Sequence, residues 1–174
     1  MPIHELIAVV LPPKTPLEIG TAEQWVKVQK ELGIELPVDL CDFGMQYGSG
    51  VMCESLHVLN PFAGRFQENV KSELETLELA ISIGGSVPYD RFPSRPGLFP
   101  WAWDENGYRF YWLTVGAKER WRIVIATEEE EYEEWSMSMT SFLAKAFTNE
   151  ISSFLSRPPI LPSQRTFRPI TKYV

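Results

Sequence analysis

Apolar positions recur at helical spacing in several stretches of the chain, and local signals mark where these stretches begin and end. Thr21 and Gln24 form a capping-box pattern, in which each side chain can satisfy a free backbone N–H. Gly33 is placed to end that helix, and Pro37 suits the first position of the next. The pattern predicts helices over about 21–33, 37–47, 66–81 and 142–155.

Extended and β-branched runs predict strands that follow one another closely. Asp104 to Gly107 forms a good hairpin turn between two of them. The apolar stretch from Ile3 to Leu11 is interpreted as an opening strand or a packed extension. Strands joined by tight turns indicate an antiparallel sheet, so the predicted fold is α+β, with helices covering a mainly antiparallel sheet. The strands are expected over 51–59, 98–103, 108–115, 121–127 and 132–136.

The distribution of charge along the chain changes near the C-terminus. The net charge is −7, yet residues 157–174 carry four basic residues, no acidic ones and several prolines. We therefore predict one domain over 1–156 and a proline-rich basic tail over 157–174. The acidic body repels nucleic acid and anionic membranes and attracts basic partners. The opening stretch lacks the features of a secretory signal, and two cysteines are too few for a disulfide scaffold, so we expect a cytoplasmic protein.

Several short motifs occur in a characteristic order. A helix with Trp25 is followed by Leu36-Pro37 and then by a helix that ends in Tyr47-Gly48-Ser49-Gly50. Further elements are Pro100-Trp101-Ala102, Tyr111-Trp112, Trp121-Arg122-Ile123-Val124 and Ser141-Phe142-Leu143. This order resembles the SUKH superfamily, which includes bacterial immunity proteins and fungal regulators of cell-wall synthesis. The resemblance covers residues 21–150 or thereabouts and leaves the first 20 residues and the tail unplaced.

The resemblance implies a binding function. Immunity members bind and neutralise a toxin, often a nuclease, so the expected partner is a cognate, basic protein toxin. The alternative is a regulatory scaffold that binds an endogenous protein, as the fungal relatives do. The family brings no catalytic motif to carry over, and the oligomeric state stays open.

Catalytic and metal-binding patterns are weak. Cys53-x-x-x-His57 has a possible ligand spacing, but a Cys-x-x-Cys pair is missing. Gly48-Ser49-Gly50 lacks the spacing of a nucleophile elbow and the lysine of a phosphate loop. We therefore expect no enzyme activity, no metal and no cofactor. A hydrolase that uses paired carboxylates is a remote alternative, because such a pair cannot be recognised from sequence.

Two features are candidate contacts for a partner. Trp101 and Trp103 lie beside the turn with Asp104 and Glu105, where exposure and burial are both open, and an exposed Trp among acidic residues is a typical binding anchor. The second feature is an acidic run that is either a solvated edge or a docking surface for a basic partner. It consists of Glu128, Glu129, Glu130, Glu131, Glu133 and Glu134.

Overall fold

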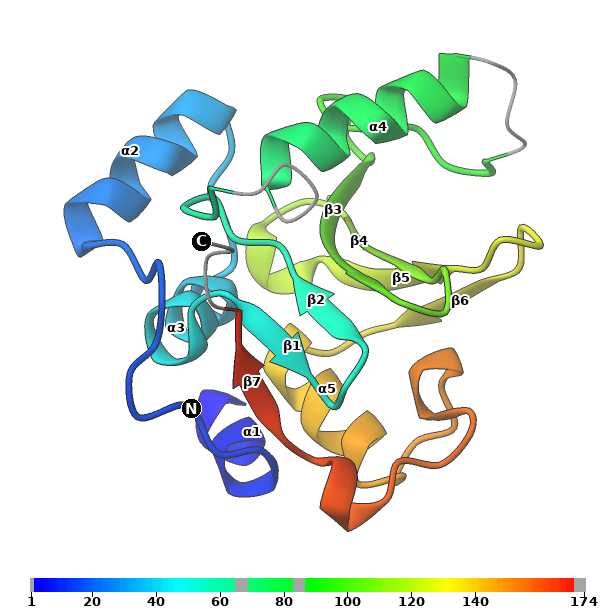
Figure 1. Ribbon diagram of the computed structural model, residues 1–174. Coiled ribbons are helices and arrows are strands. Elements are labelled where there is room, and N and C mark those ends of the chain that lie inside the picture. Colours follow the sequence, from blue (N-terminus) through cyan, green and yellow to red (C-terminus); the bar gives the residue numbers. More distant parts are fainter. Residues whose placement is uncertain (1, 65–68, 83–86, 171–174) are drawn as a thin grey trace.

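The computed structural model describes residues 2–64, 69–82 and 87–170. Among these residues, seven strands form one antiparallel sheet in the order β6-β5-β4-β3-β2-β1-β7, as Figure 1 shows. The α+β prediction is confirmed. The strands are β1 (Gly50–Met52), β2 (Leu56–Val58), β3 (Leu98–Asp104), β4 (Arg109–Leu113), β5 (Arg122–Ala126), β6 (Tyr132–Trp135) and β7 (Phe167–Pro169).

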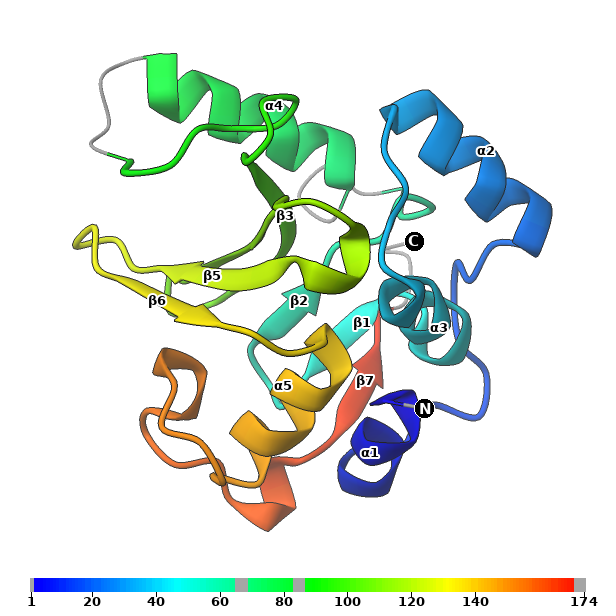
Figure 2. The same cartoon turned by 180° about the vertical axis from the view of Figure 1, so that it is seen from behind.

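Helices cover both faces of the sheet. On one face, α5 packs with α1 and α3, and on the other α4 crosses β3, as the two opposite views show (Figures 1 and 2). The helices are α1 (Pro2–Val9), α2 (Ala22–Leu32), α3 (Val38–Tyr47), α4 (Val70–Ser82) and α5 (Met139–Phe147). Short 3-10 turns are η2 (Lys118–Arg120), η3 (Phe154–Ser156) and η4 (Pro162–Gln164).

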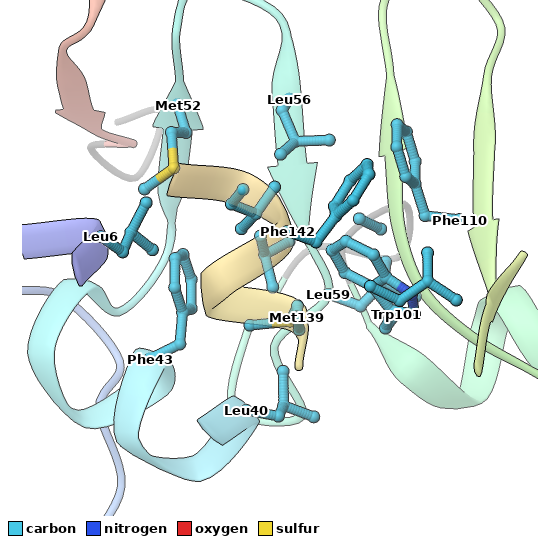
Figure 3. Close-up of a cluster of buried hydrophobic side chains, with 14 of the residues drawn as sticks. Leu6, Leu40, Phe43, Met52, Leu56, Leu59, Trp101, Phe110, Met139 and Phe142 are labelled. Carbon is cyan, nitrogen blue, oxygen red and sulfur yellow. The ribbon is translucent and has the colours of Figure 1, made fainter. Parts of the chain in front are cut away.

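The main core lies between the sheet and α5. Phe142 of α5 meets Trp101 and Phe110 of the sheet, while Phe43 and Leu6 close the cluster from α3 and α1 (Figure 3). These five side chains are at most 2% exposed. Burial of large apolar side chains is the main stabilising term of such a domain, at about 1.5–3 kcal/mol for each. A smaller cluster lies under α4 on the opposite face.

The helix boundary signals have the expected local roles. Thr21 and Gln24 form both hydrogen bonds of the capping box, and Gly33 ends α2 in the left-handed conformation with φ 67°. Pro37 is the N-cap residue of α3, so the helix begins at Val38, one position after the predicted start. The last helix is shorter than predicted: α5 ends at Phe147, and the apolar stripe continues into η3. Residues 66–68, the start of the helix predicted over 66–81, lie outside the described residues.

The prediction for the opening stretch was wrong, because it forms a helix. Ile3, Leu6 and Val10 of this stretch are almost fully buried, which is the spacing of one helical face. The Ser141 hydroxyl of α5 donates a hydrogen bond to Glu5 at 2.8 Å. The helix α1 thus closes one side of the core through contacts with α5.

The single strand predicted over 51–59 is two strands. The chain turns back at Cys53 and Glu54, whose φ angles are 48° and 66°, and Ser55 N–H donates to Met52 C=O at 3.3 Å. Both central residues of this β-turn thus have a positive φ, which favours Gly or Asn. Neither is Gly or Asn, so the sequence carries no turn signal here.

The Tyr-Gly-x-Gly motif joins α3 to the sheet. The Tyr47 hydroxyl donates to the Val10 carbonyl at 2.6 Å. Gly48 has φ 66°, and a Cβ there would lie 2.0 Å from the Leu17 carbonyl oxygen. Ser49 N–H donates to that same oxygen at 2.9 Å. The glycine is required because the 17–19 segment lies directly against the chain.

The basic tail supplies an edge strand. Phe167 to Pro169 pair with β1, and the Phe167 ring packs on Tyr47 at 5.2 Å between centroids. Ile160 also packs against the core, whereas Leu161 is 58% exposed. A proline fits in β7 because the strand has a partner on one side only.

Candidate functional site: an acidic rim at one end of the sheet

The acidic run forms the hairpin between β5 and β6. Thr127 N–H donates to Glu131 C=O at 3.0 Å, which closes a loop of four exposed glutamates, Glu128 to Glu131. Glu130 occupies the left-handed conformation with φ 60°. In the part of the chain that the structure describes, none of the four carboxylates forms an ion pair.

Glu133 and Glu134 do not belong to this loop, because they lie on β6 and point to opposite faces. Glu133 accepts hydrogen bonds from the Ser153 hydroxyl and from Phe154 N–H, the latter at 3.1 Å. Glu134 forms an ion pair with Arg122 at 2.6 Å and accepts a hydrogen bond from Tyr89. Both carboxylates therefore have partners within the domain.

Burial and the hydrogen bond to Glu134 together raise the pKa of Tyr89. Removal from water is the main cause, and the hydrogen bond and charge of Glu134 add to it, so the pKa of Tyr89 rises to about 12. The tyrosine therefore stays neutral, and its hydroxyl donates a hydrogen bond to Glu134. The Arg122–Glu134–Tyr89 cluster joins β5 and β6 to the segment before β3.

A β-bulge separates the two candidate tryptophans. The register between β3 and β4 shifts between Pro100 and Ala102, so Trp101 and Ala102 both stand opposite Phe110. Trp101 is 0% exposed, and the expectation that it is an exposed anchor is wrong. Because of the bulge, the Trp103 side chain lies on the face of the sheet opposite to that of Trp101.

Trp103 forms the centre of a row across three strands. Its ring stacks on His57 of β2 with centroids 4.1 Å apart, and the Arg109 guanidinium of β4 lies 5.8 Å from its ring. Arginine over the face of Trp is a favourable cation–π geometry. The Glu105 carboxylate lies 3.2 Å from His57 Nε2 and is 59% exposed. Trp103 itself is half-buried, so only part of its ring is accessible.

Asp104 organises the turn between β3 and β4. Its carboxylate accepts hydrogen bonds from Tyr108 N–H at 2.8 Å and from Asn106 N–H at 3.0 Å. Asp104 is 2% exposed, and burial raises the pKa of its carboxyl while the hydrogen bonds act in the opposite direction. This residue was expected to contact a partner, but its side chain is turned inward to hold the hairpin.

Three hairpin turns meet at the same end of the sheet. Glu105 N–H donates to Ser55 C=O at 3.2 Å, which joins the β3–β4 turn to the β1–β2 turn. Gly107 faces the Glu128 side chain, so the β5–β6 loop lies beside them. The turns carry exposed glutamates, which we call the acidic rim: Glu54, Glu105, Glu128, Glu129, Glu130 and Glu131. Glu54 was missed from sequence because its turn was not recognised.

Cys53 is buried and Cys41 is half-buried, and both are free thiols. Burial raises the pKa of the Cys41 thiol to about 11 and that of Cys53 to about 12. Thiols that stay protonated are poor nucleophiles and poor metal ligands. Across residues 2–64, 69–82 and 87–170, no three His, Cys, Asp or Glu side chains come together as a metal site. Within the same ranges, none of the helices has the length and apolar character needed to span a bilayer.

The fold is that of an α+β domain, and comparison with known proteins gives its family. A family model of the SUKH superfamily, described as SMI1-KNR4 cell-wall, matches residues 22–143. The chain belongs to this family, which confirms the resemblance drawn from its motifs. Membership supports an immunity or regulatory protein in general.

Two further comparisons add little to this assignment. A solved structure, the crystal structure of a protein from Pseudomonas syringae pv. tomato, is 17% identical with a TM-score of 0.48. The similarity covers 78% of this chain and 89% of that one. No curated protein sequence matched the chain.

Proposed function

We propose that this chain is an immunity protein that neutralises a basic, nuclease-type toxin in the cytoplasm by binding it directly. The observation that carries the proposal is the family match over residues 22–143. The acidic rim supports the proposal that the partner is basic, because it presents six carboxylates on three neighbouring turns of a chain with net charge −7. A nuclease needs a basic groove for its substrate, and an acidic protein that occupies this groove competes with nucleic acid.

The rim acts mainly on the encounter between the two proteins. Exposed charges attract a partner over roughly 8 Å at physiological ionic strength, and this attraction raises the association rate more than it lengthens the bound lifetime. Contacts that hold the complex then come from less charged groups nearby. Trp103 occupies that position, since it belongs to the end of β3, next to the turn that carries Glu105.

A regulatory protein that binds an endogenous partner is the second candidate. The description of the matching family, SMI1-KNR4 cell-wall, favours it. The neighbouring gene separates the two: a toxin with a basic C-terminal domain supports immunity, and its absence from every related locus supports regulation. Under either function the chain acts by binding, and the rim is the surface to test.

The test is binding kinetics with the toxin encoded beside the gene, at two salt concentrations. The variant replaces Glu129 and Glu130 by Gln, which removes two rim charges and leaves both side chains nearly the same size. The control replaces Glu23 and Glu75, two exposed glutamates on α2 and α4, by Gln. We expect the rim variant to associate roughly threefold to tenfold more slowly at low salt and to depend less on salt. Equal rates for the two variants would show that the toxin docks elsewhere.

A further inference from the structure

A hollow of about 760 Å³ lies between α2 and the turn that precedes β5. A second hollow, of about 300 Å³, continues beside the start of α3. Lys118, Glu119 and Trp121 line both, so the two hollows adjoin each other, and together we call them the trough.

The walls of the trough are held by hydrogen bonds within the domain. The Gln29 side chain on α2 accepts a hydrogen bond from Leu36 N–H at 2.7 Å, which fixes the link between α2 and α3. On the opposite wall, the Trp121 indole N–H donates to Gly116 C=O at 3.4 Å. An ion pair between Lys118 and Glu35, 3.0 Å long, spans the two walls. A preformed site of this kind loses little entropy when it is occupied.

Two glycines leave the trough open to a backbone. Gly33 and Gly116 have φ angles of 67° and 65°, and a Cβ on either would meet nothing within 4 Å. Glycine at such positions lets a second chain approach the backbone closely. An extended peptide has the shape to follow a depression bounded in this way.

The lining combines apolar surface with cations. Val26 of α2 is 66% exposed and Val38 of α3 is 62% exposed, so each end of the trough has an aliphatic wall in contact with water. In the larger hollow, Lys30, Arg95 and Lys118 outnumber the two glutamates. Over the described ranges, Lys30 and Arg95 form no ion pair, and this local excess of positive charge stands in a chain of net charge −7.

We infer that the trough binds an extended segment of a partner protein that carries a carboxylate beside an apolar side chain. The carboxylate lies between Lys30 and Arg95, and the apolar side chain packs against Val26 and Trp121. The glutamates of the larger hollow disfavour a densely charged ligand such as nucleic acid, whereas one or two carboxylates on an apolar peptide match the mixed lining. Buried apolar contacts give the affinity, and the cations orient the segment.

The trough is separate from the acidic rim. The 116–121 turn precedes β5 and the Glu128–Glu131 loop follows it, so the two surfaces lie at opposite ends of that strand, as Figure 2 shows. The inference therefore goes beyond the proposed toxin binding and does not require it. A rim variant should leave peptide binding unchanged.

The experiment selects a phage-displayed library of random linear peptides on the purified full chain. We expect the enriched peptides to share an acidic residue next to an aliphatic or aromatic one. The best peptide is then synthesised with a fluorescent label, and its Kd is measured by fluorescence anisotropy with the parent and with Lys30→Glu. Reversal of this charge should weaken binding by at least about tenfold, a difference of about 1.4 kcal/mol.

Lys27→Glu is the matched control, because it makes the same charge change on the same exposed helix outside the trough lining. We expect less than a threefold effect from it, and none from the Glu129→Gln/Glu130→Gln rim variant. Val26→Glu places a like charge against the bound carboxylate and should also weaken binding. Failure to enrich acidic–apolar peptides, or equal Kd values for Lys30→Glu and Lys27→Glu, would overturn the inference.

Discussion

The carboxylate of Glu133 caps the 3-10 turn that begins at Phe154, where it accepts a hydrogen bond from the backbone N–H at 3.1 Å. The Ser153 hydroxyl donates to the same carboxylate. Ser153 is 0% exposed, so the contact holds a buried polar group. A glutamate from the acidic run thus fixes the segment that follows α5 to the edge of the sheet.

Glu133→Gln should therefore destabilise the domain, unlike changes in the loop beside it. The amide keeps one acceptor but loses the charge that strengthens both hydrogen bonds, which costs about 1–2 kcal/mol. Glu129→Gln, in the exposed loop, should stay within about 0.5 kcal/mol of the parent. Urea denaturation of the two variants measures this difference, and equal stabilities would show that the Glu133 contact contributes nothing.

The hairpin between β1 and β2 can be improved. Glu54 has φ 66°, a conformation that costs a residue with a side chain about 1 kcal/mol, and Glu54→Gly should remove most of that cost. Glu54→Ala is the control, because it removes the same charge but keeps a Cβ. We expect thermal denaturation to show a higher Tm for the Gly variant only. An equal rise in both would mean that charge repulsion in the rim, and not the backbone, is the cause.

Gly48 and Gly33 should respond differently to a methyl group. Both have positive φ, but a Cβ on Gly48 would lie 2.0 Å from the Leu17 carbonyl oxygen, whereas one on Gly33 would meet open space. We expect Gly48→Ala to cost about 3 kcal/mol or more and Gly33→Ala about 1 kcal/mol. Chemical denaturation checks both, and similar costs would contradict the close approach of the 17–19 segment.

Asp104 should make stability depend on pH. Burial raises the pKa of its carboxyl above the ordinary 3.8, so the native state holds this proton more tightly than the unfolded chain does. Its contribution is fully present below about pH 3.8 and is lost as the pH rises through the folded value. Asp104→Asn cannot titrate. We therefore expect the stability of the Asn variant relative to the parent to improve as the pH rises from about 3.8. A difference that stays constant with pH would contradict this.

Elements with local signals were predictable from the sequence. The capping box at Thr21 and the turn from Asp104 to Gly107 depend on residues within a few positions of one another, and both form as expected. The helix α1 also left a signal, since Ile3, Leu6 and Val10 have helical spacing, but the stretch is too short for this spacing to exclude a strand.

The remaining features depend on contacts that spacing does not encode. The bulge at Trp101 follows from how β3 pairs with β4, and it decides which tryptophan is buried. The acidic run looked uniform, yet alternation along β6 gives Glu133 and Glu134 partners far away in sequence. The acidic rim could not be predicted for a similar reason, because the sequence does not show which turns lie at the same end of the sheet.

Strand β7 has a consequence for synthesis on the ribosome. The partner of Val51 in β1 is Arg168, so β1 emerges from the exit tunnel long before the segment that covers its outer edge. Until that segment arrives, the backbone N–H and C=O groups of β1 are open to strands from other nascent chains. We therefore expect ribosome-bound chains stalled before Phe167 to remain protease-sensitive and chaperone-bound around β1, and chains that are completed through β7 and released to lose this sensitivity.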